Sequence, residues 1–211
     1  MHFERDRAAL LAIDLQRAFC ARDGSIAAQG RDISEIEAAA ARALELARVA
    51  QAAGVPVIWT AMHYAADYAD GGLLMHELRP NLARIGALRR GTADVELIEG
   101  AAPHARDVVL GKQRFSAFVG THLEQVLSAR GINCLMVCGV TTSMCVESSV
   151  RDAGQRDLRT FVVAQACGDF DPARHAASLS AMAFGYARVI ALDRAVAALQ
   201  SERSEFAADP S

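Results

Sequence analysis

The fold is decided by residues 134–148, which read CLMVCGVTTSMCVES. The unbroken apolar run from Cys134 to Cys138 predicts a buried strand, and the segment from Ser143 to Gln155 predicts a helix. The strand therefore passes through a short turn directly into a helix. Such a connection is typical of sheets whose strands alternate with helices.

The same alternation extends outward over the whole chain. Apolar runs predict five further strands, at residues 8–13, 55–60, 108–110, 161–164 and 188–192. Helical spacing of apolar residues predicts helices at residues 33–53, 117–130 and 173–184. Parallel strands need a crossover long enough to hold a helix. We therefore predict an α/β fold with a doubly wound, six-stranded parallel sheet and helices on both faces, a Rossmann-like arrangement.

The chain of 211 residues, 52% of them hydrophobic, has the length and composition of one globular domain. We predict a single domain over residues 1–200 and a frayed tail over residues 201–211. Residues 62–105 are weakly periodic and rich in Gly, His, Arg and Asp, and predict loop with short helix. Loops beyond the carboxyl ends of parallel strands usually set ligand specificity.

Charge and cysteine content narrow the function classes. The net charge is -3, and no basic run is long enough to attract nucleic acid or anionic lipid, so neither partner is expected. No apolar stretch reaches membrane-spanning length and no cleavable leader is visible, so a cytoplasmic location is expected. The five cysteines are scattered without a CxxC pair, which fits neither a zinc site nor a disulfide framework.

Cys145 lies where the turn enters the helix. Unpaired N–H groups and the helix dipole favour a thiolate there, so we expect a lowered pKa and a nucleophilic sulfur. The same N–H groups could hold the oxyanion that develops during acyl transfer. A buried structural cysteine explains the position equally well on this turn alone.

Two more strand ends favour catalysis. Asp14 ends the first predicted strand, and Lys112 follows the third. In a doubly wound sheet both would converge with Cys145 at one edge. The carboxylate could then take the thiol proton and return it to a leaving amine, while the ammonium stabilises the anions. Taken separately, Asp14 could be a helix cap and Lys112 a solvated charge.

Three motifs in order resemble the isochorismatase-like cysteine hydrolases, a family that includes nicotinamidases, N-carbamoylsarcosine amidases, ureidoacrylate and biuret hydrolases, and isochorismatases. They are Asp14 and Gln16 after an apolar run, Lys112 after the third strand, and the turn Gly139–Val146. The resemblance covers residues 7–195. It implies the family fold, the triad Asp14, Lys112 and Cys145, and a homo-oligomer, either dimer or tetramer.

The resemblance also implies two backbone features of the turn. One is a cis peptide between Val140 and Thr141. The other is an oxyanion hole formed by the N–H groups of Thr141 and Cys145. A cis peptide bond before a residue other than proline costs about 3 kcal/mol, so it persists only where function requires it.

The position after the second strand separates branches of the family. Nicotinamidases carry a metal-binding Asp-x-His there, whereas this chain reads Thr60-Ala61-Met62-His63-Tyr64. Met62 stands where the aspartate would fall, and the next histidine, His76, lies well downstream. Two histidines without a carboxylate make a poor metal site, so we expect no catalytic metal and no cofactor. With the cysteine present, the motifs favour hydrolysis of a C–N bond in a small amide, carbamoyl or ureido compound through a Cys145 thioester.

Candidate substrate-binding residues lie beyond the first strands and after Lys112. They are Phe19, Trp59, His63, Tyr64 and Arg114. Aromatic side chains would form a wall for a planar amide, and Arg114 could pair with a substrate carboxylate. Phe19 and Trp59 could instead belong to the core, and Arg114 could be a surface charge.

Three alternatives remain open at the level of sequence. The chain could act as an isochorismatase or a nicotinamidase, it could be a non-catalytic relative that has kept the fold, or Cys145 could be a redox-sensing thiol. Retention of Asp14, Lys112 and Cys145 favours the enzyme.

Overall fold

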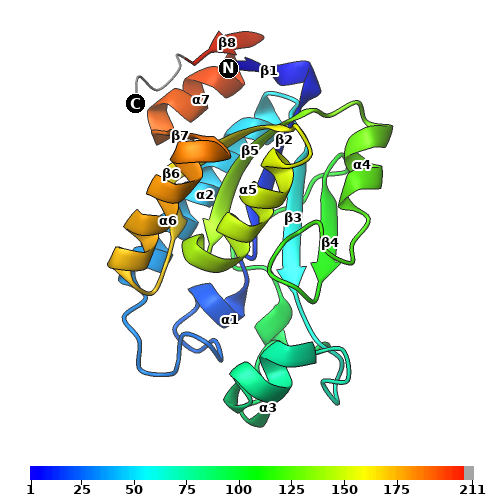
Figure 1. The fold of residues 1–211 in the computed structure, drawn as a ribbon, viewed down its shortest axis with the longest axis vertical. Helices are drawn as coiled ribbons and strands as arrows, with labels where there is room; N and C mark the ends of the chain where they lie inside the picture. The colour runs from blue at the N-terminus through cyan, green and yellow to red at the C-terminus, as the bar shows by residue number, and fades with distance from the viewer. Residues whose placement is uncertain (207–211) are drawn as a thin grey trace.

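The computed structural model describes residues 1–206 of the chain. Its centre is a six-stranded sheet in the order β4-β3-β2-β5-β6-β7, with every neighbouring pair parallel (Figure 1). The strands are β2 (Ala8–Ile13), β3 (Val57–Met62), β4 (Val108–Lys112), β5 (Cys134–Val140), β6 (Arg159–Gly168) and β7 (Arg188–Ile190). The chain winds outward from β2 in both directions, which confirms the predicted α/β fold.

The two central strands approach each other closely. All of β2 pairs with residues 134–139 of β5, and every residue of both strands is buried. Gly139 has φ 122° and faces Ile13, and a Cβ atom on Gly139 would lie 2.1 Å from the Ile13 carbonyl oxygen. Only glycine fits there, because a side chain would collide with backbone that cannot move aside. The glycine thus lets the turn after β5 lie directly beside the end of β2.

Helices cover both faces of the sheet. They are α1 (Arg17–Cys20), α2 (Ser34–Ala52), α3 (Asn81–Arg84), α4 (Leu123–Ala129), α5 (Glu147–Gly154), α6 (Pro172–Gly185) and α7 (Leu192–Gln200). Figure 1 shows α5 and α6 in front of the sheet and α2 behind it. The buried side of α2 consists of residues at helical spacing, among them Ile36, Ala43 and Leu46, and the left-handed Gly54 follows its end.

The helices of the structure differ from the prediction in two places. The helix expected from residue 117 begins only at Leu123, because Gly120 adopts φ 69° and the Thr121 hydroxyl accepts a hydrogen bond from the Leu123 N–H. Helix α7 was not predicted. It packs beside α2 and β6 and buries three small or apolar side chains, Ala195, Ala198 and Leu199.

The prediction of a frayed tail from residue 201 is wrong for its first part. Strand β8 (Arg203–Glu205) pairs antiparallel with β1 (His2–Glu4). The buried ring of Phe206 then lies 4.7 Å from that of Phe161 in β6. Apolar packing of this kind outweighs the polar composition that suggested fraying. Residues 207–211 of the predicted tail lie outside the described residues.

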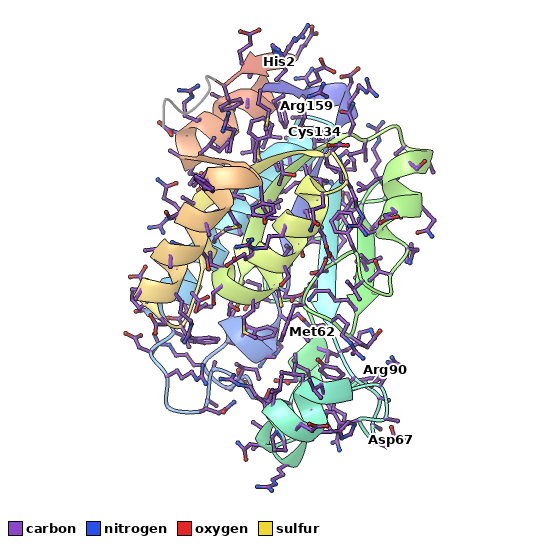
Figure 2. The ribbon with its side chains drawn as sticks, in the orientation of Figure 1. His2, Met62, Asp67, Arg90, Cys134 and Arg159 are labelled. Atoms are coloured by element: carbon purple, nitrogen blue, oxygen red, sulfur yellow. The ribbon has the colours of Figure 1, made fainter. Side chains whose placement is uncertain are left out.

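The segment 62–105 lies beyond the carboxyl ends of the strands, below β3 and β4 in Figure 1. It contains α3 and two short turns of helix, Leu74–Leu78 and Ala93–Val95, as the weak periodicity predicts. In Figure 2, Met62 marks the sheet edge from which it leaves, and Cys134 and Arg159 mark the opposite end. Within residues 1–206, no helix has the length and apolar character needed to cross a membrane.

Candidate active site

A buried ion pair lies at the carboxyl edge of the sheet. Lys112, the last residue of β4, places its Nζ 2.7 Å from Oδ2 of Asp14, the residue after β2. Both side chains are fully buried although β3 separates the two strands. Burying charge is unfavourable unless the charges are paired and hydrogen-bonded, so this pair must be held by further contacts.

Neighbouring groups supply those contacts. The Thr60 hydroxyl on β3 donates to Asp14 Oδ1 at 2.6 Å and accepts from the Asp14 N–H at 3.1 Å. The Lys112 ammonium also donates to the carbonyl oxygens of Arg114 at 3.1 Å and Phe115 at 3.0 Å. Asp14 itself adopts φ 51°, a conformation uncommon for non-glycine residues and frequent at functional sites. Both charged side chains are thereby fixed in orientation.

Gln16 joins the ends of β2 and β3. Its side-chain amide donates to the Met62 carbonyl at 3.0 Å and accepts from the Met62 N–H at 2.8 Å. It also donates to the Val95 carbonyl at 2.9 Å. The glutamine two residues after Asp14 thus ties the start of segment 62–105 to the sheet.

Cys145 lies in a π-helical turn, Thr142–Val146, which leads into α5. Burial raises the pKa of its thiol well above the usual value, Lys112 opposes this shift, and Asp14 adds to it through charge and a hydrogen bond. Burial alone would lower the pKa of Lys112, but Asp14 and Cys145 outweigh it and raise that pKa. The expected low-pKa thiolate is therefore wrong: desolvation and the carboxylate outweigh the helix end and the ammonium.

This pKa predicts how the free protein reacts with iodoacetamide. Because only the thiolate reacts, the alkylation rate of Cys145 should rise about tenfold per pH unit from pH 7 to pH 9 without a plateau. Mass-spectrometric mapping of the Cys145 peptide against time measures it, with free cysteine as the reference. A rate that levels off below pH 8 would contradict the raised pKa.

Asp169 and His175 hold the turn that carries Cys145. The buried Asp169 carboxylate accepts from the Ser143 N–H at 2.8 Å and from the Ser143 hydroxyl at 2.7 Å. The Thr142 hydroxyl lies 2.9 Å from His175 Nδ1. The peptide bond between Val140 and Thr141 is cis.

A cavity of about 300 Å3 opens beside this turn. Its lining includes Thr141, Ser143 and Cys145 from the turn, together with side chains from the loops beyond β2 and β3. Most of the wall is apolar, as in typical small-molecule sites. A compound bound in this cavity would meet the Cys145 thiol.

Of the predicted substrate-binding residues, Phe19 lines this cavity. Trp59 does not. It is 1% exposed in the middle of β3, where its indole N–H donates to Asp107 at 3.3 Å, so the prediction for Trp59 is wrong and it is a core residue. Aromatic residues in strands commonly pack in this way, and the hydrogen bond to Asp107 satisfies the buried indole N–H.

His63, Tyr64 and Arg114 are also absent from the cavity lining. His63 lies against Gly111 of the edge strand, where burial and the Arg90 guanidinium lower its pKa. The Arg114 guanidinium donates to the carbonyl oxygens of Asp70 and Gln113. Tyr64 is fully buried, with its ring 6.2 Å from that of Tyr68. These side chains build the base of segment 62–105 and not the wall predicted for the substrate.

Tyr64 offers a stability test. Its buried hydroxyl has no hydrogen-bond partner among the described residues, and a buried unsatisfied polar group costs about 1–3 kcal/mol. Tyr64→Phe should therefore keep or raise the free energy of unfolding, by up to about 1 kcal/mol. Urea denaturation measures the change, with Tyr68→Phe as the control, because the Tyr68 hydroxyl donates to the Ala87 carbonyl and its loss should destabilise. A loss above 1 kcal/mol in Tyr64→Phe would contradict this account.

Sequence reasoning missed several side chains of the site. Thr60 interrupts the apolar run of β3, and Asp169 directly follows β6, so one carries the signal of a polar residue within a buried strand and the other that of a polar residue at a strand end. Met62, Phe115 and Phe170 line the cavity but carry no signal that separates them from core residues. Over residues 1–206, no group of three or more His, Cys, Asp or Glu side chains is placed to hold a metal ion.

Comparison with known proteins agrees with this geometry. The isochorismatase domain model matches residues 8–194. The ureidoacrylate amidohydrolase RutB of Methylorubrum extorquens strain AM1 is 32% identical over 182 residues, which is 81% of this chain and 73% of that protein.

Two solved structures are similar over most of their length. A cysteine hydrolase from Pseudomonas syringae pv. phaseolicola superposes with a TM-score of 0.84 and 27% identity, over 95% of both chains. The N-carbamoylsarcosine amidase from Thermoplasma acidophilum has a TM-score of 0.73 and 25% identity, over 89% of this chain and 97% of that one. The fold, the domain match and the relatives together show that this chain belongs to the isochorismatase family of hydrolases.

Proposed function

We propose that the chain is a cysteine amidohydrolase that cleaves the C–N bond of a small amide, carbamoyl or ureido compound through a thioester on Cys145. The observation that carries the proposal is the buried pair of Asp14 and Lys112 at the thiol of Cys145, in the wall of a cavity. A buried carboxylate and ammonium that touch a cysteine are the groups that acyl transfer from an amide requires.

The first half-reaction forms the thioester. Asp14 takes the proton from the thiol as Sγ bonds to the substrate carbonyl carbon, and the carbonyl oxygen becomes an oxyanion. The N–H groups of Thr141 and Cys145, both residues of the cavity wall, would hold that oxygen. The C–N bond then breaks, and Asp14 returns the proton to the leaving nitrogen, which departs as ammonia or an amine.

The second half-reaction uses water. Asp14 takes a proton from a water molecule whose oxygen attacks the thioester carbon, the C–S bond breaks, and the thiolate recovers its proton from Asp14. Lys112 keeps its charge throughout, because its pKa is raised, and it stabilises both the carboxylate and the transient thiolate. The cycle consumes one water and needs no oxidant, reductant or cofactor.

The raised pKa of the Cys145 thiol explains why its attack on the substrate needs a base. A thiolate already present at neutral pH would not require Asp14 for the first step. A redox-sensing thiol, in contrast, is exposed and readily ionised, whereas Cys145 is 4% exposed with a raised pKa. This contrast favours the hydrolase over the sensor.

The substrate class rests on the relatives. Two similar proteins are named for a ureido and a carbamoyl compound, and the cavity is small enough to enclose a molecule of that size. The partner we propose is therefore a small amide or ureido molecule. A homo-oligomer, a dimer or tetramer, and a cytoplasmic location stay predictions from the sequence, as does the single domain over residues 1–200.

The test is ammonia release from a panel of primary amides, N-carbamoyl compounds and ureido acids, followed by a coupled assay with purified protein. The proposal expects turnover of at least one ureido or carbamoyl compound and no requirement for added metal. If nicotinamide were hydrolysed while every ureido and carbamoyl compound was left intact, the proposed substrate class would be wrong.

A further inference from the structure

Apart from Thr141, Ser143 and Cys145 of the turn, the wall of the cavity has two chemical parts. The larger part is apolar and comes from the loops beyond the sheet as well as from the turn. Its side chains include Phe19, Met62, Leu82, Phe115 and Phe170. The smaller part is charged and consists of Arg31, Arg79, Arg174 and Asp169.

The apolar part is larger than a simple amide needs. A compound such as acetamide has one methyl group and would leave most of these side chains without contact. Each methylene group moved from water into an apolar environment improves binding about fourfold. A substrate with an extended hydrocarbon body would therefore be bound far better than a short one.

The three arginines differ in how far their charge is already neutralised. Arg174 lies 3.2 Å from Asp169 and 3.6 Å from Asp171, so its guanidinium has two carboxylate partners. Arg79 has no acidic partner within residues 1–206, but it is exposed, just after the helical turn Leu74–Leu78, so water screens its charge. Arg31 is half-buried, its guanidinium lies 5.1 Å from the centre of the Phe170 ring, and it has no acidic partner within the described residues.

A guanidinium stacked on an aromatic ring keeps its edge free for hydrogen bonds. Arg31 is thus a fixed and unneutralised cation in the wall of a cavity that is otherwise mostly apolar. A substrate carboxylate would fit it through a bidentate pair, because the planar fork of arginine matches the two carboxylate oxygens.

We infer that the substrate of this site is an amide or ureido compound with an extended apolar body that ends in a carboxylate, and that Arg31 recognises this carboxylate. The inference rests on the proposed hydrolysis and specifies its substrate class. Cys145 attacks the carbonyl at one end of the molecule, the apolar wall holds the body, and Arg31 binds the other end.

Three ureas separate length from charge. The probes are 3-ureidopropionate, 6-ureidohexanoate, and hexylurea, in which a methyl group replaces the carboxylate of 6-ureidohexanoate. The inference expects the highest kcat/KM for 6-ureidohexanoate, at least tenfold above each of the others. A preference for 3-ureidopropionate, or equal values for 6-ureidohexanoate and hexylurea, would overturn it.

Arg31→Met removes the charge and keeps a flexible apolar stem. It should lower kcat/KM for 6-ureidohexanoate by about ten- to a hundredfold and leave hexylurea within about twofold. A purely structural role of Arg31 would affect both ureas alike. Arg22→Met is the matched control from the same loop, because the Arg22 guanidinium is paired with Glu37 and is absent from the cavity wall. A selective loss in Arg79→Met but not in Arg31→Met would contradict the assignment.

Binding distinguishes this inference from the proposed function. Calorimetry with Cys145→Ala measures the dissociation constants of the three ureas without turnover. Tighter binding of 6-ureidohexanoate than of the other two ureas, lost in Arg31→Met, would support the inference. If the wild type nevertheless hydrolysed none of the three ureas, that result would count against the proposed function alone. If no urea bound, or if binding ignored Arg31, the inference would fail whatever the activity.

Discussion

Replacing Cys145 by alanine should lower kcat for ammonia release by about 10^4-fold or more and leave the fold intact. The reason is that no other thiol lines the cavity: its lining contains Cys145 but not Cys20, Cys134, Cys138 or Cys167, and the hydroxyls of Thr141 and Ser143 are weaker nucleophiles at neutral pH. Losses of this size are typical when a nucleophile is removed from a group of residues that acts as a unit. Cys145→Ser should lose nearly as much, because the hydroxyl is a weaker nucleophile at neutral pH. Steady-state kinetics and circular dichroism measure both effects.

Cys20→Ala provides the matched control. Cys20 is buried near Asp14. Burial raises the pKa of the Cys20 thiol to about 12, and the negative charge of Asp14 contributes a smaller part of this rise. A thiol close to the triad but outside the cavity should be dispensable, so kcat should stay within a few fold of the wild type. If Cys20→Ala were inactive and Cys145→Ala active, the assignment of the nucleophile would be wrong.

Replacing Lys112 by methionine should destabilise the protein by about 3–5 kcal/mol and abolish activity. The substitution keeps most of the side-chain volume. It leaves the Asp14 carboxylate, which is 0% exposed, without its counter-ion. The double variant Asp14→Asn, Lys112→Met should recover part of the lost free energy of unfolding, because neither charge is then left alone. Urea denaturation of the wild type, both single variants and the double variant gives the coupling energy.

The pH dependence of that difference follows from Lys112. Its pKa in the folded protein is raised, so the folded state holds the proton more tightly than the unfolded state, whose pKa is near 10.5. The stabilising contribution is therefore fully present below pH 10.5 and is lost as the pH rises through the higher folded value. The stability gap between wild type and Lys112→Met should therefore not shrink from pH 7 to pH 9, where Lys112 stays charged. A gap that vanished near pH 7, or single variants as stable as the wild type, would contradict a buried ion pair.

The sequence predicted the layered sheet because each strand is a short apolar run and each crossover is a periodic helix. β2 and β5 are buried on both faces and therefore carry continuous apolar runs. The chain ends were less predictable. β1 and β8 are three residues each, and their position depends on Phe3 and Phe206 packing on the distant Phe161, which local patterns do not reveal.

The candidate site was predictable where a single polar or reactive residue lies at, or shortly after, the end of a strand. Asp14, Lys112 and Cys145 were identified in this way, and the structure brings their side chains together. The substrate wall was predicted less well: Phe19 lines the cavity, whereas Trp59 belongs to the core. Segment 62–105 contributes to that wall through tertiary contacts, and an apolar residue in a loop has no sequence signal that separates a pocket from a core. The pKa of Cys145 was misjudged because burial cannot be read from position on a helix.

The central claim is a thioester on Cys145, and an acid quench during turnover tests it most directly. The protein is mixed with a ureido compound that it hydrolyses, and the reaction is quenched at low pH within milliseconds. The masses of the intact protein and of its peptides are then measured. The account predicts an added acyl or carbamoyl mass on the Cys145 peptide that is absent in Cys145→Ala. Turnover with no adduct on Cys145 at any quench time, or an adduct on another residue, would contradict it.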